Sequence, residues 1–464
     1  MVRTRVRRGS ALALVSAAAA LAGGGTPAAA ADLGGNCCAD LEERIAELEA
    51  TTVRKGNRKV SLEVSGHINE ALIWWDDGYE SNVYQVTNDN SRSRVRFVGK
   101  AKINGDWEAG YKIEIGVRTA NSKRFDQNDT DGSLSDPANV GLDVRDSYWF
   151  VKSKSLGALS VGLQSSATDQ ITEINLTQTK DFSKYSDVED TGLGLRLRAT
   201  DGGLSSLAWR RLIGDSGDQP GEGEKRAQAV KYETPTFQGF SASASWGEDD
   251  YWDIALRYAG EFSGFKVAAG IGYLEMTDGG YTNTECNARG LGVPRDEKCT
   301  QFGGSFSVVH ESSGLFVNFG AGQKTDDVIN TTPLYAGVAG VDDQQSFWSI
   351  QAGIEKKFYD LGKTTIYGEY YDYSGAPIAR TIGAGDAVNP LGTTAAVFDT
   401  GVQVWGAGIA QGIDSAAMTV YLSYRHVEGD LTLKGVAGGV ANGPIAEASF
   451  EDLDLVMSGA IIRF

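Results

Sequence analysis

From Lys59 onward, apolar and polar residues alternate along the chain with a period of two. Val60, Leu62 and Val64, for example, are separated by single polar residues. Successive side chains of a β-strand point to opposite faces, so this pattern predicts strands that separate an apolar environment from a polar one. The alternation recurs to the end of the chain and predicts an all-β, antiparallel protein.

The alternation predicts eighteen strands, and sixteen if one hairpin is misread. They are expected near residues 59–75, 91–104, 106–118, 142–154, 157–165, 190–200, 203–213, 226–235, 238–247, 251–262, 265–275, 301–312, 315–323, 345–358, 363–373, 401–412, 416–428 and 452–464. The long loops between them all fall on one side, at 76–90, 119–141, 166–189, 276–300, 324–344, 374–400 and 429–451. Transmembrane β-barrels of the outer membrane have short periplasmic turns and long external loops, so this segregation predicts such a barrel.

The last predicted strand ends in an aromatic residue, Phe464, which shares one face with Ala460 and Ile462. A barrel must pair its last strand with its first, and membrane barrels carry aromatic girdles at the membrane edges. The ending therefore supports a transmembrane antiparallel β-barrel over residues 59–464, located in the outer membrane of a Gram-negative cell.

Residues 1–31 have the features of a secretory signal peptide. Four arginines precede the apolar run 11–22, and the small residues 29–31 suit a cleavage site. The apolar run is too short to cross a bilayer as a helix. The alternative is a lipoprotein acylated at Cys37, which the preceding Asn36 disfavours.

A short helix is predicted at residues 39–53. Leu41, Ile45 and Leu48 follow the 4-3 spacing of a coiled-coil seam. Two heptads are too short to be stable alone, but three chains joined through their barrels would hold the helices at high effective concentration. The prediction is a periplasmic leader at residues 32–58 with a short coiled-coil helix, and a loosely ordered leader is the alternative.

The chain is acidic, with a formal net charge of −18. Nucleic-acid binding requires clustered cationic charge, so this balance disfavours nucleic acid as a partner. On the external loops of a barrel, the acids could be bridged by divalent cations to anionic headgroups. Outer-membrane lipid and lipopolysaccharide are therefore the expected surroundings.

Four cysteines are present, and export to an oxidising compartment favours disulfides. Cys286 and Cys299 flank a glycine-rich segment and are expected to staple one external loop. Cys37 and Cys38 are adjacent and could cross-link subunits, form a vicinal bridge or stay free. The spacing does not fit a zinc site and no nucleophile motif is present, so the sequence predicts no metal, no cofactor and no enzymatic activity.

Basic residues recur at every second position of the second predicted strand, at Arg92, Arg94 and Arg96. An arginine that faces lipid near the bilayer midplane costs about 2–4 kcal/mol, so these side chains are expected to face the lumen. Arg196 and Arg198 follow the same alternation in another predicted strand. Together the five predict a cationic wall, and the alternative is scattered charges that are each paired with a neighbouring acid.

The loop near 166–189 is acidic, and with its edge it contains Asp181, Asp187, Glu189 and Asp190. If it folds inward, these carboxylates face the arginines and set a transverse field across a constriction. The alternative is an ordinary exposed acidic loop.

Two segments carry a resemblance to a known family. One is the leader that begins Cys38-Ala-Asp-Leu-Glu-Glu-Arg, and the other begins Asp146-Ser-Tyr-Trp-Phe-Val and runs to Gln164. Both resemble alphaproteobacterial outer-membrane porins, and the resemblance extends from Cys37 to the end of the chain. The family has a basic residue where this chain has Leu163, so one constriction charge is missing.

The resemblance implies a homotrimeric porin with a water-filled channel for passive diffusion of small hydrophilic solutes and ions. It also implies 16 strands, which differs from the eighteen that the alternation predicts. A substrate-specific channel and a structural or adhesive barrel are the alternatives.

Overall fold

The computed structural model describes residues 59–130, 141–214, 219–223, 226–247, 251–277, 298–375 and 380–464. The predicted signal peptide, the leader helix, and Cys37, Cys38 and Cys286 lie outside these ranges.

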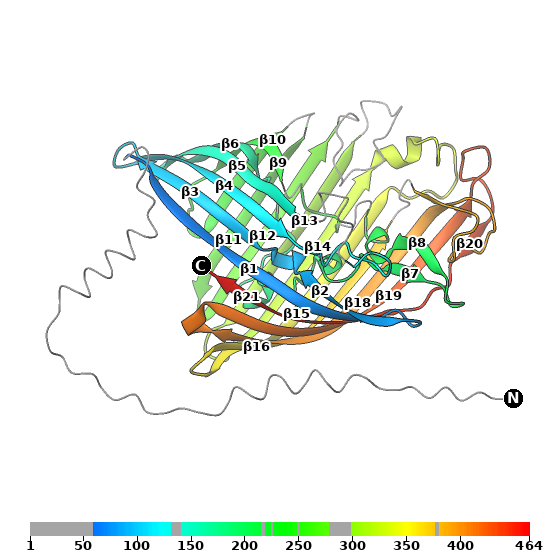
Figure 1. Cartoon of the computed structure of the whole chain (residues 1–464). Helices are drawn as coiled ribbons and strands as arrows, with labels where there is room; N and C mark the ends of the chain where they lie inside the picture. The colour runs from blue at the N-terminus through cyan, green and yellow to red at the C-terminus, as the bar shows by residue number, and fades with distance from the viewer. Residues whose placement is uncertain are drawn as a thin grey trace. The chain divides into compact units, whose positions relative to one another are not determined.

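Sixteen antiparallel strands in the described ranges close into one barrel (Figure 1). In order round the ring they are β1 (Ser61–Asp76), β3 (Arg94–Lys102), β4 (Trp107–Arg118), β5 (Gly141–Ser153), β6 (Gly157–Gln164), β9 (Ala227–Glu233), β10 (Phe240–Gly247), β11 (Trp252–Phe262), β12 (Phe265–Met276), β13 (Cys299–His310), β14 (Leu315–Asp326), β15 (Gln344–Tyr359), β16 (Gly362–Gly375), β18 (Ala395–Ile413), β19 (Met418–Gly435) and β21 (Leu453–Arg463). The prediction of eighteen strands is therefore wrong, and the alternative of sixteen is correct.

The ring closes where β21 pairs with β1, with Ile462 opposite Ile68. Beyond the strand end, Phe464 and Gly66 exchange both backbone hydrogen bonds, at 3.1 and 2.9 Å. Gly66 has no side chain where the Phe464 ring lies, since a Cβ there would come within 2.7 Å of its Cζ. The terminal aromatic residue thus takes part in closing the barrel, as the alternation predicts.

The two surplus strands, predicted at 190–200 and 203–213, do not belong to the ring. Their regular parts are β7 (Arg196–Arg198) and β8 (Leu204–Ala208), which pair only with each other, while β6 pairs directly with β9. Leu195 is fully buried. Alternation shows that one side of a segment is apolar, but not whether that side meets lipid or protein. Here it meets protein, which is why the strand count is two too high.

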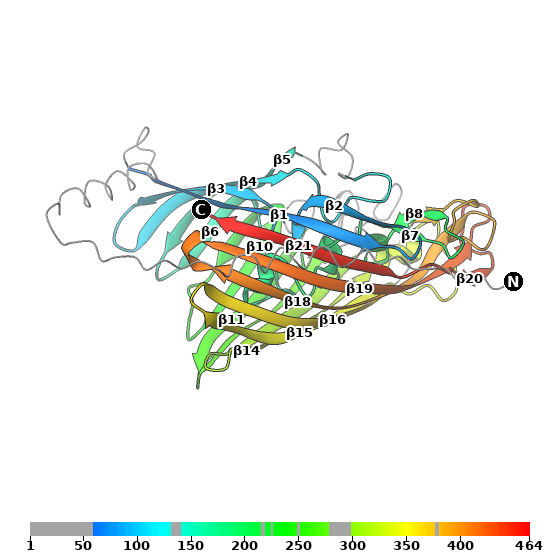
Figure 2. The same ribbon diagram turned by 60° about the horizontal axis from the view of Figure 1, so that its bottom comes forward.

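The apolar sides of this segment pack inside the barrel against β1, β16, β18, β19 and β21. We call this cluster the inner core, and its members include Ile73, Trp75, Leu195, Trp209, Val404 and Leu455. Both views place β7 and β8 beside the ends of β1 and β19, at the barrel end remote from the C-terminus (Figures 1 and 2). The inner core therefore occupies one side of the lumen.

The predicted loop 76–90 contains a further strand, β2 (Ser81–Thr87), which pairs with the second half of β1. A short 3-10 helix, η1 (Asp89–Ser91), then interrupts the chain before β3. The remaining short elements are η2 (Gln178–Asp181), η3 (Val188–Asp190), η4 (Trp209–Arg211), η5 (Asp327–Thr331), β17 (Thr381–Ile382), η6 (Asp414–Ala416) and β20 (Ile445–Glu447). Within the described ranges, no helix has the length and apolar character needed to cross a membrane.

Cys299 is buried at the start of β13. Its predicted partner, Cys286, lies outside the described residues, so this disulfide stays a prediction.

Candidate functional site

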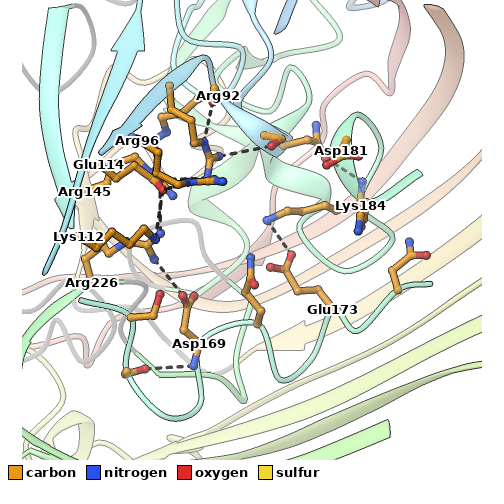
Figure 3. A pocket seen from close by; sticks show the side chains of 18 of the residues that line it. Arg92, Arg96, Lys112, Glu114, Arg145, Asp169, Glu173, Asp181, Lys184 and Arg226 are labelled. Atoms are coloured by element: carbon orange, nitrogen blue, oxygen red, sulfur yellow. Dashed lines mark hydrogen bonds and ion pairs between the residues drawn. The ribbon is translucent and has the colours of Figure 1, made fainter. Parts of the chain in front are cut away.

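A cavity of about 1280 Å³ lies inside the barrel, and we call it the lumen cavity. Its lining comes from strands β1, β3, β4, β5, β9, β10, β11 and β21 and from residues 165–190. Figure 3 shows some of these side chains, among them Arg96, Glu114 and Asp181. Of the described residues that line it, fourteen are Lys or Arg and eight are Asp or Glu. The site is therefore a polar, highly charged passage beside the inner core.

Three of the predicted wall arginines, Arg92, Arg94 and Arg96, line this cavity. Arg94 and Arg96 point inward because alternate residues of β3 share one face. Arg92 precedes β3 and forms ion pairs with Asp89 at 3.1 Å and Asp143 at 3.0 Å. The basic side chains that gather here, called the basic wall below, are Arg92, Arg94, Arg96, Lys112, Arg145 and Arg226.

Glu114 is the shared carboxylate of the basic wall. It lies opposite Arg96 in the β3–β4 ladder and accepts hydrogen bonds from Arg94 at 3.2 Å, Arg96 at 2.7 Å and Arg145 at 2.8 Å. Lys112 approaches it to 3.4 Å, and the Glu114 side chain is only 1% exposed. One buried carboxylate thus offsets the repulsion between several neighbouring cations.

Arg145, which the period of two does not place in the lumen, enters it through a β-bulge. The ladder between β4 and β5 pairs Glu114 with Asp146 and Ile115 with Val144, which leaves Arg145 as the extra residue. A bulge breaks the period of two, so Arg145 and Asp146 both reach the lumen side. The signal in the sequence was the pair of consecutive charged residues inside an otherwise alternating strand.

The segment 166–190, called the lumen loop below, runs through the interior of the ring. Its hydrogen bonds and ion pairs reach several parts of the wall. The wall partners are Asp253 of β11 for Thr168, Ser305 of β13 for Ile174, Thr365 of β16 for Gln178 and Arg463 of β21 for Asp181. Because the ring is closed, a segment with partners on such widely separated strands crosses the lumen.

A buried arginine, Arg425 of β19, anchors the middle of the lumen loop. Its Nε donates to Glu369 of β16 at 2.7 Å, and its two terminal nitrogens donate to the backbone carbonyls of Lys184 at 2.7 Å and Val188 at 3.2 Å. Its side chain is 1% exposed. The hydrogen bonds to Lys184 and Val188 therefore tie the loop to the wall, and the ion pair with Glu369 compensates the buried charge of Arg425.

The four predicted loop carboxylates occupy two different environments. Asp181 and Asp190 line the lumen cavity. Asp187 and Glu189 are fully buried and do not line it. The structure thus brings only half of this set to the passage.

Lysines hold the buried loop carboxylates. Lys184 forms an ion pair with Asp187 at 2.7 Å, and Lys123 forms ion pairs with Glu189 at 3.3 Å and Asp190 at 3.4 Å. Much of the loop's negative charge is therefore compensated locally.

Arg196 and Arg198 lie on β7, away from the lumen cavity and from the basic wall. Arg196 forms an ion pair with Asp126 at 2.8 Å, and Arg198 forms ion pairs with Asp77 at 2.8 Å and Glu80 at 2.9 Å. These contacts attach the β7–β8 sheet to the segments that contain Asp77, Glu80 and Asp126. The two arginines do not join the basic wall, because residues 190–200 are not a wall strand.

Asp89 lies on η1, outside the membrane-spanning strands. Burial alone would raise the pKa of its carboxyl, but the nearby cations, Arg92 foremost and then Lys123, lower that pKa below its ordinary value. The carboxyl therefore stays ionised near neutral pH, and its ion pair with Arg92 persists.

The described residues contain no group of three or more His, Cys, Asp or Glu side chains arranged to hold a metal ion.

Comparisons with known proteins place this geometry in context. Residues 13–438 match a family model described as Gram-negative porin. No curated protein sequence matches the chain. Among solved structures, an anion-selective porin from Comamonas acidovorans is 13% identical, with a TM-score of 0.50, over 87% of this chain and 100% of that chain. An in-vitro folded OmpT, an outer membrane protein of Vibrio cholerae, is 13% identical, with a TM-score of 0.49, over 89% of this chain and 99% of that chain.

Proposed function

This chain belongs to the Gram-negative porin family, and we propose that its lumen cavity is the constriction of the diffusion pore. As a family member it is a general diffusion porin of the Gram-negative outer membrane, a channel without enzymatic activity. The observation that carries the proposal is the lumen loop, whose partners lie on β11, β13, β16 and β21 of one closed barrel. Solutes then pass between the lumen loop and the basic wall, because the inner core fills the opposite side.

The constriction combines a fixed width with a charged lining. Arg425, which pairs with Glu369, donates to the Lys184 and Val188 carbonyls and so holds the lumen loop in place, which sets the width. The basic wall and Asp181 line the gap from opposite sides (Figure 3). Such a passage suits small hydrophilic solutes and ions, since polar walls replace part of the hydration that a narrow pore removes.

Purified chain added to planar lipid bilayers is expected to produce discrete open-channel conductance steps. Vesicles that contain it should swell in small sugars and resist larger ones, because the lumen loop limits the width. A folded barrel that gives no conductance steps contradicts the porin function and favours a structural or adhesive barrel. Block of the conductance by one particular sugar or anion favours a substrate-specific channel.

We also propose that the pore is a homotrimer, which the family membership suggests. Glu70 of β1 shares the outward-facing row of Ile68 and Leu72, which are 47% and 46% exposed. Its carboxylate accepts hydrogen bonds from Thr87 and Ser93, each at 3.1 Å. An ionised carboxylate that faces lipid is costly, so this side of the barrel suits a contact between subunits.

Replacing Glu70 with lysine is expected to lower the trimer fraction of the detergent-extracted chain, because the change disrupts a polar contact on the proposed interface. Native mass measurement or chemical cross-linking reads the trimer fraction. The matched control is Glu261→Lys at the exposed periplasmic end of β11. Equal trimer fractions in the two folded variants would place the interface elsewhere. The leader helix at 39–53 and contacts with lipopolysaccharide stay predictions.

A further inference from the structure

We infer that the pore favours small anions over cations of similar size. This inference rests on the proposed constriction and adds the class of solute that crosses it most readily. Three features of the described residues support this inference. They are the sign of the lining charge, the greater exposure of cations than of the carboxylates Glu114 and Asp146, and the cations that form no ion pair with a described carboxylate.

The lining of the lumen cavity has the opposite sign to the whole chain. The full sequence carries a net charge of −18, yet among the described lining residues Lys and Arg outnumber Asp and Glu by fourteen to eight. An acidic protein that concentrates basic residues on its passage surrounds the passing solute with positive potential. Charged clefts with low-dielectric walls concentrate counter-ions in this way.

Around Glu114 and Asp146, the cations of the basic wall stand between the carboxylates and the water. The side chains of Glu114 and Asp146 are 1% and 2% exposed. Arg96, Lys112 and Arg226, which pair with them, remain 34%, 24% and 21% exposed. At these two carboxylates a solute meets guanidinium and ammonium groups first, whereas Asp143 is 36% exposed beside Arg92, whose side chain is 15% exposed. Local pairing therefore lowers the positive potential without reversing it.

Three lining cations have no carboxylate within ion-pair distance among the residues that the structure describes. They are Arg124, Lys180 and Arg257. Arg257 donates to the Ser243 hydroxyl at 3.2 Å and the Asp169 backbone carbonyl at 2.9 Å, which are both neutral acceptors. Carboxylates such as Asp169 lie near enough to Arg257 to act on it electrostatically, but none forms a direct ion pair with it among the described residues.

The described acidic lining residues all form an ion pair with a basic residue. Among the described lining residues, only cations therefore lack an ion-pair partner. The pairs are Asp89 and Asp143 with Arg92, Glu114 with Arg96, Asp169 with Arg226, Glu173 with Lys184, Asp181 with Arg463, Asp190 with Lys123 and Glu233 with Lys231. The unbalanced charge in the passage is therefore positive. Guanidinium groups are also good hydrogen-bond donors to anionic oxygens, so small carboxylates and phosphates belong to the favoured class.

The test is the reversal potential of the folded chain in a planar bilayer across a potassium chloride gradient. We expect a chloride-to-potassium permeability ratio above one, which rises as the salt concentration falls because screening weakens. The combined variant Arg124→Gln, Lys180→Gln and Arg257→Gln is expected to lower the ratio about threefold, an order-of-magnitude figure for removing nearby partly screened charges. These substitutions break no ion pair among the described residues, so the barrel should still fold.

The matched control removes the same charge outside the lumen cavity. It is the combined variant Lys154→Gln, Lys356→Gln and Lys357→Gln, whose side chains are exposed at the strand ends opposite the long loops. Its permeability ratio should equal that of the parent. Open-channel steps with a ratio of one or less, or equal ratios in the two triple variants, overturn the anion preference and leave the pore itself standing. Absence of any steps overturns the proposed function and this inference together.

Discussion

Replacing Arg425 with methionine is expected to destabilise the folded barrel by about 3–5 kcal/mol, the usual cost of removing one partner from a buried ion pair. Glu369 would keep a charge that is only 4% exposed, and the Lys184 and Val188 carbonyls would lose their donors. The free energy of unfolding can be measured by denaturant titration of the chain folded in detergent micelles. The same variant should show noisier open-channel current, because the lumen loop loses its anchor.

The matched control is the double variant Arg425→Met with Glu369→Gln. It removes both charges, and a buried pair replaced on both sides can be nearly neutral for stability. We therefore expect the double variant to recover much of the lost free energy. If it is as unstable as the single variant, the ion pair does not account for the effect of Arg425.

Exchanging Arg94 and Arg96 for glutamate is expected to shift the ion preference strongly toward cations. The exchange changes the charge of the cavity lining by four units at a place where all solutes are proposed to pass. Reversal potentials in a salt gradient measure the shift. An unchanged reversal potential would mean that the basic wall does not lie at the constriction.

This double exchange also places new carboxylates beside Glu114, so its folding needs a separate readout. Heat-dependent migration in electrophoresis reports whether the barrel has formed. The variant Arg94→Gln with Arg96→Gln creates no new repulsion and should shift the preference in the same direction by a smaller amount. A folded glutamine variant with the parent's ion preference would contradict the assignment as clearly as the glutamate variant.

Much of the wall could be predicted from the alternation alone. Each of the sixteen wall strands corresponds to a predicted segment, and the pairing of β21 with β1 agrees with the parity of Phe464 and Ile462. Arg94 and Arg96 line the lumen cavity, since side-chain direction in a strand follows from backbone geometry. Arg145 could not be placed this way, because it is the extra residue of a bulge, where the period of two breaks.

The sequence pattern could not predict how the carboxylates of the lumen loop are oriented. A row of carboxylates predicts negative charge, but not the direction in which each carboxylate points. Asp187 and Glu189 are buried beside lysines, while Asp181 and Asp190 line the passage. The lysines are Lys184, which lies in the loop itself, and Lys123, which lies in a distant segment. Only the folded chain therefore shows which loop carboxylates have their charge compensated.

The sequence by itself determined that the chain forms a β-barrel with an apolar exterior and basic residues on its inner face, because a period of two is imposed locally by every strand. The tertiary structure decided the number of strands, since Leu193, Leu195 and Leu197 are equally suited to lipid and to the inner core. It also decided the charge of the passage. An electrostatic potential depends on which residues lie near one another and which meet water, and those relations arise only when distant segments fold into the same lumen.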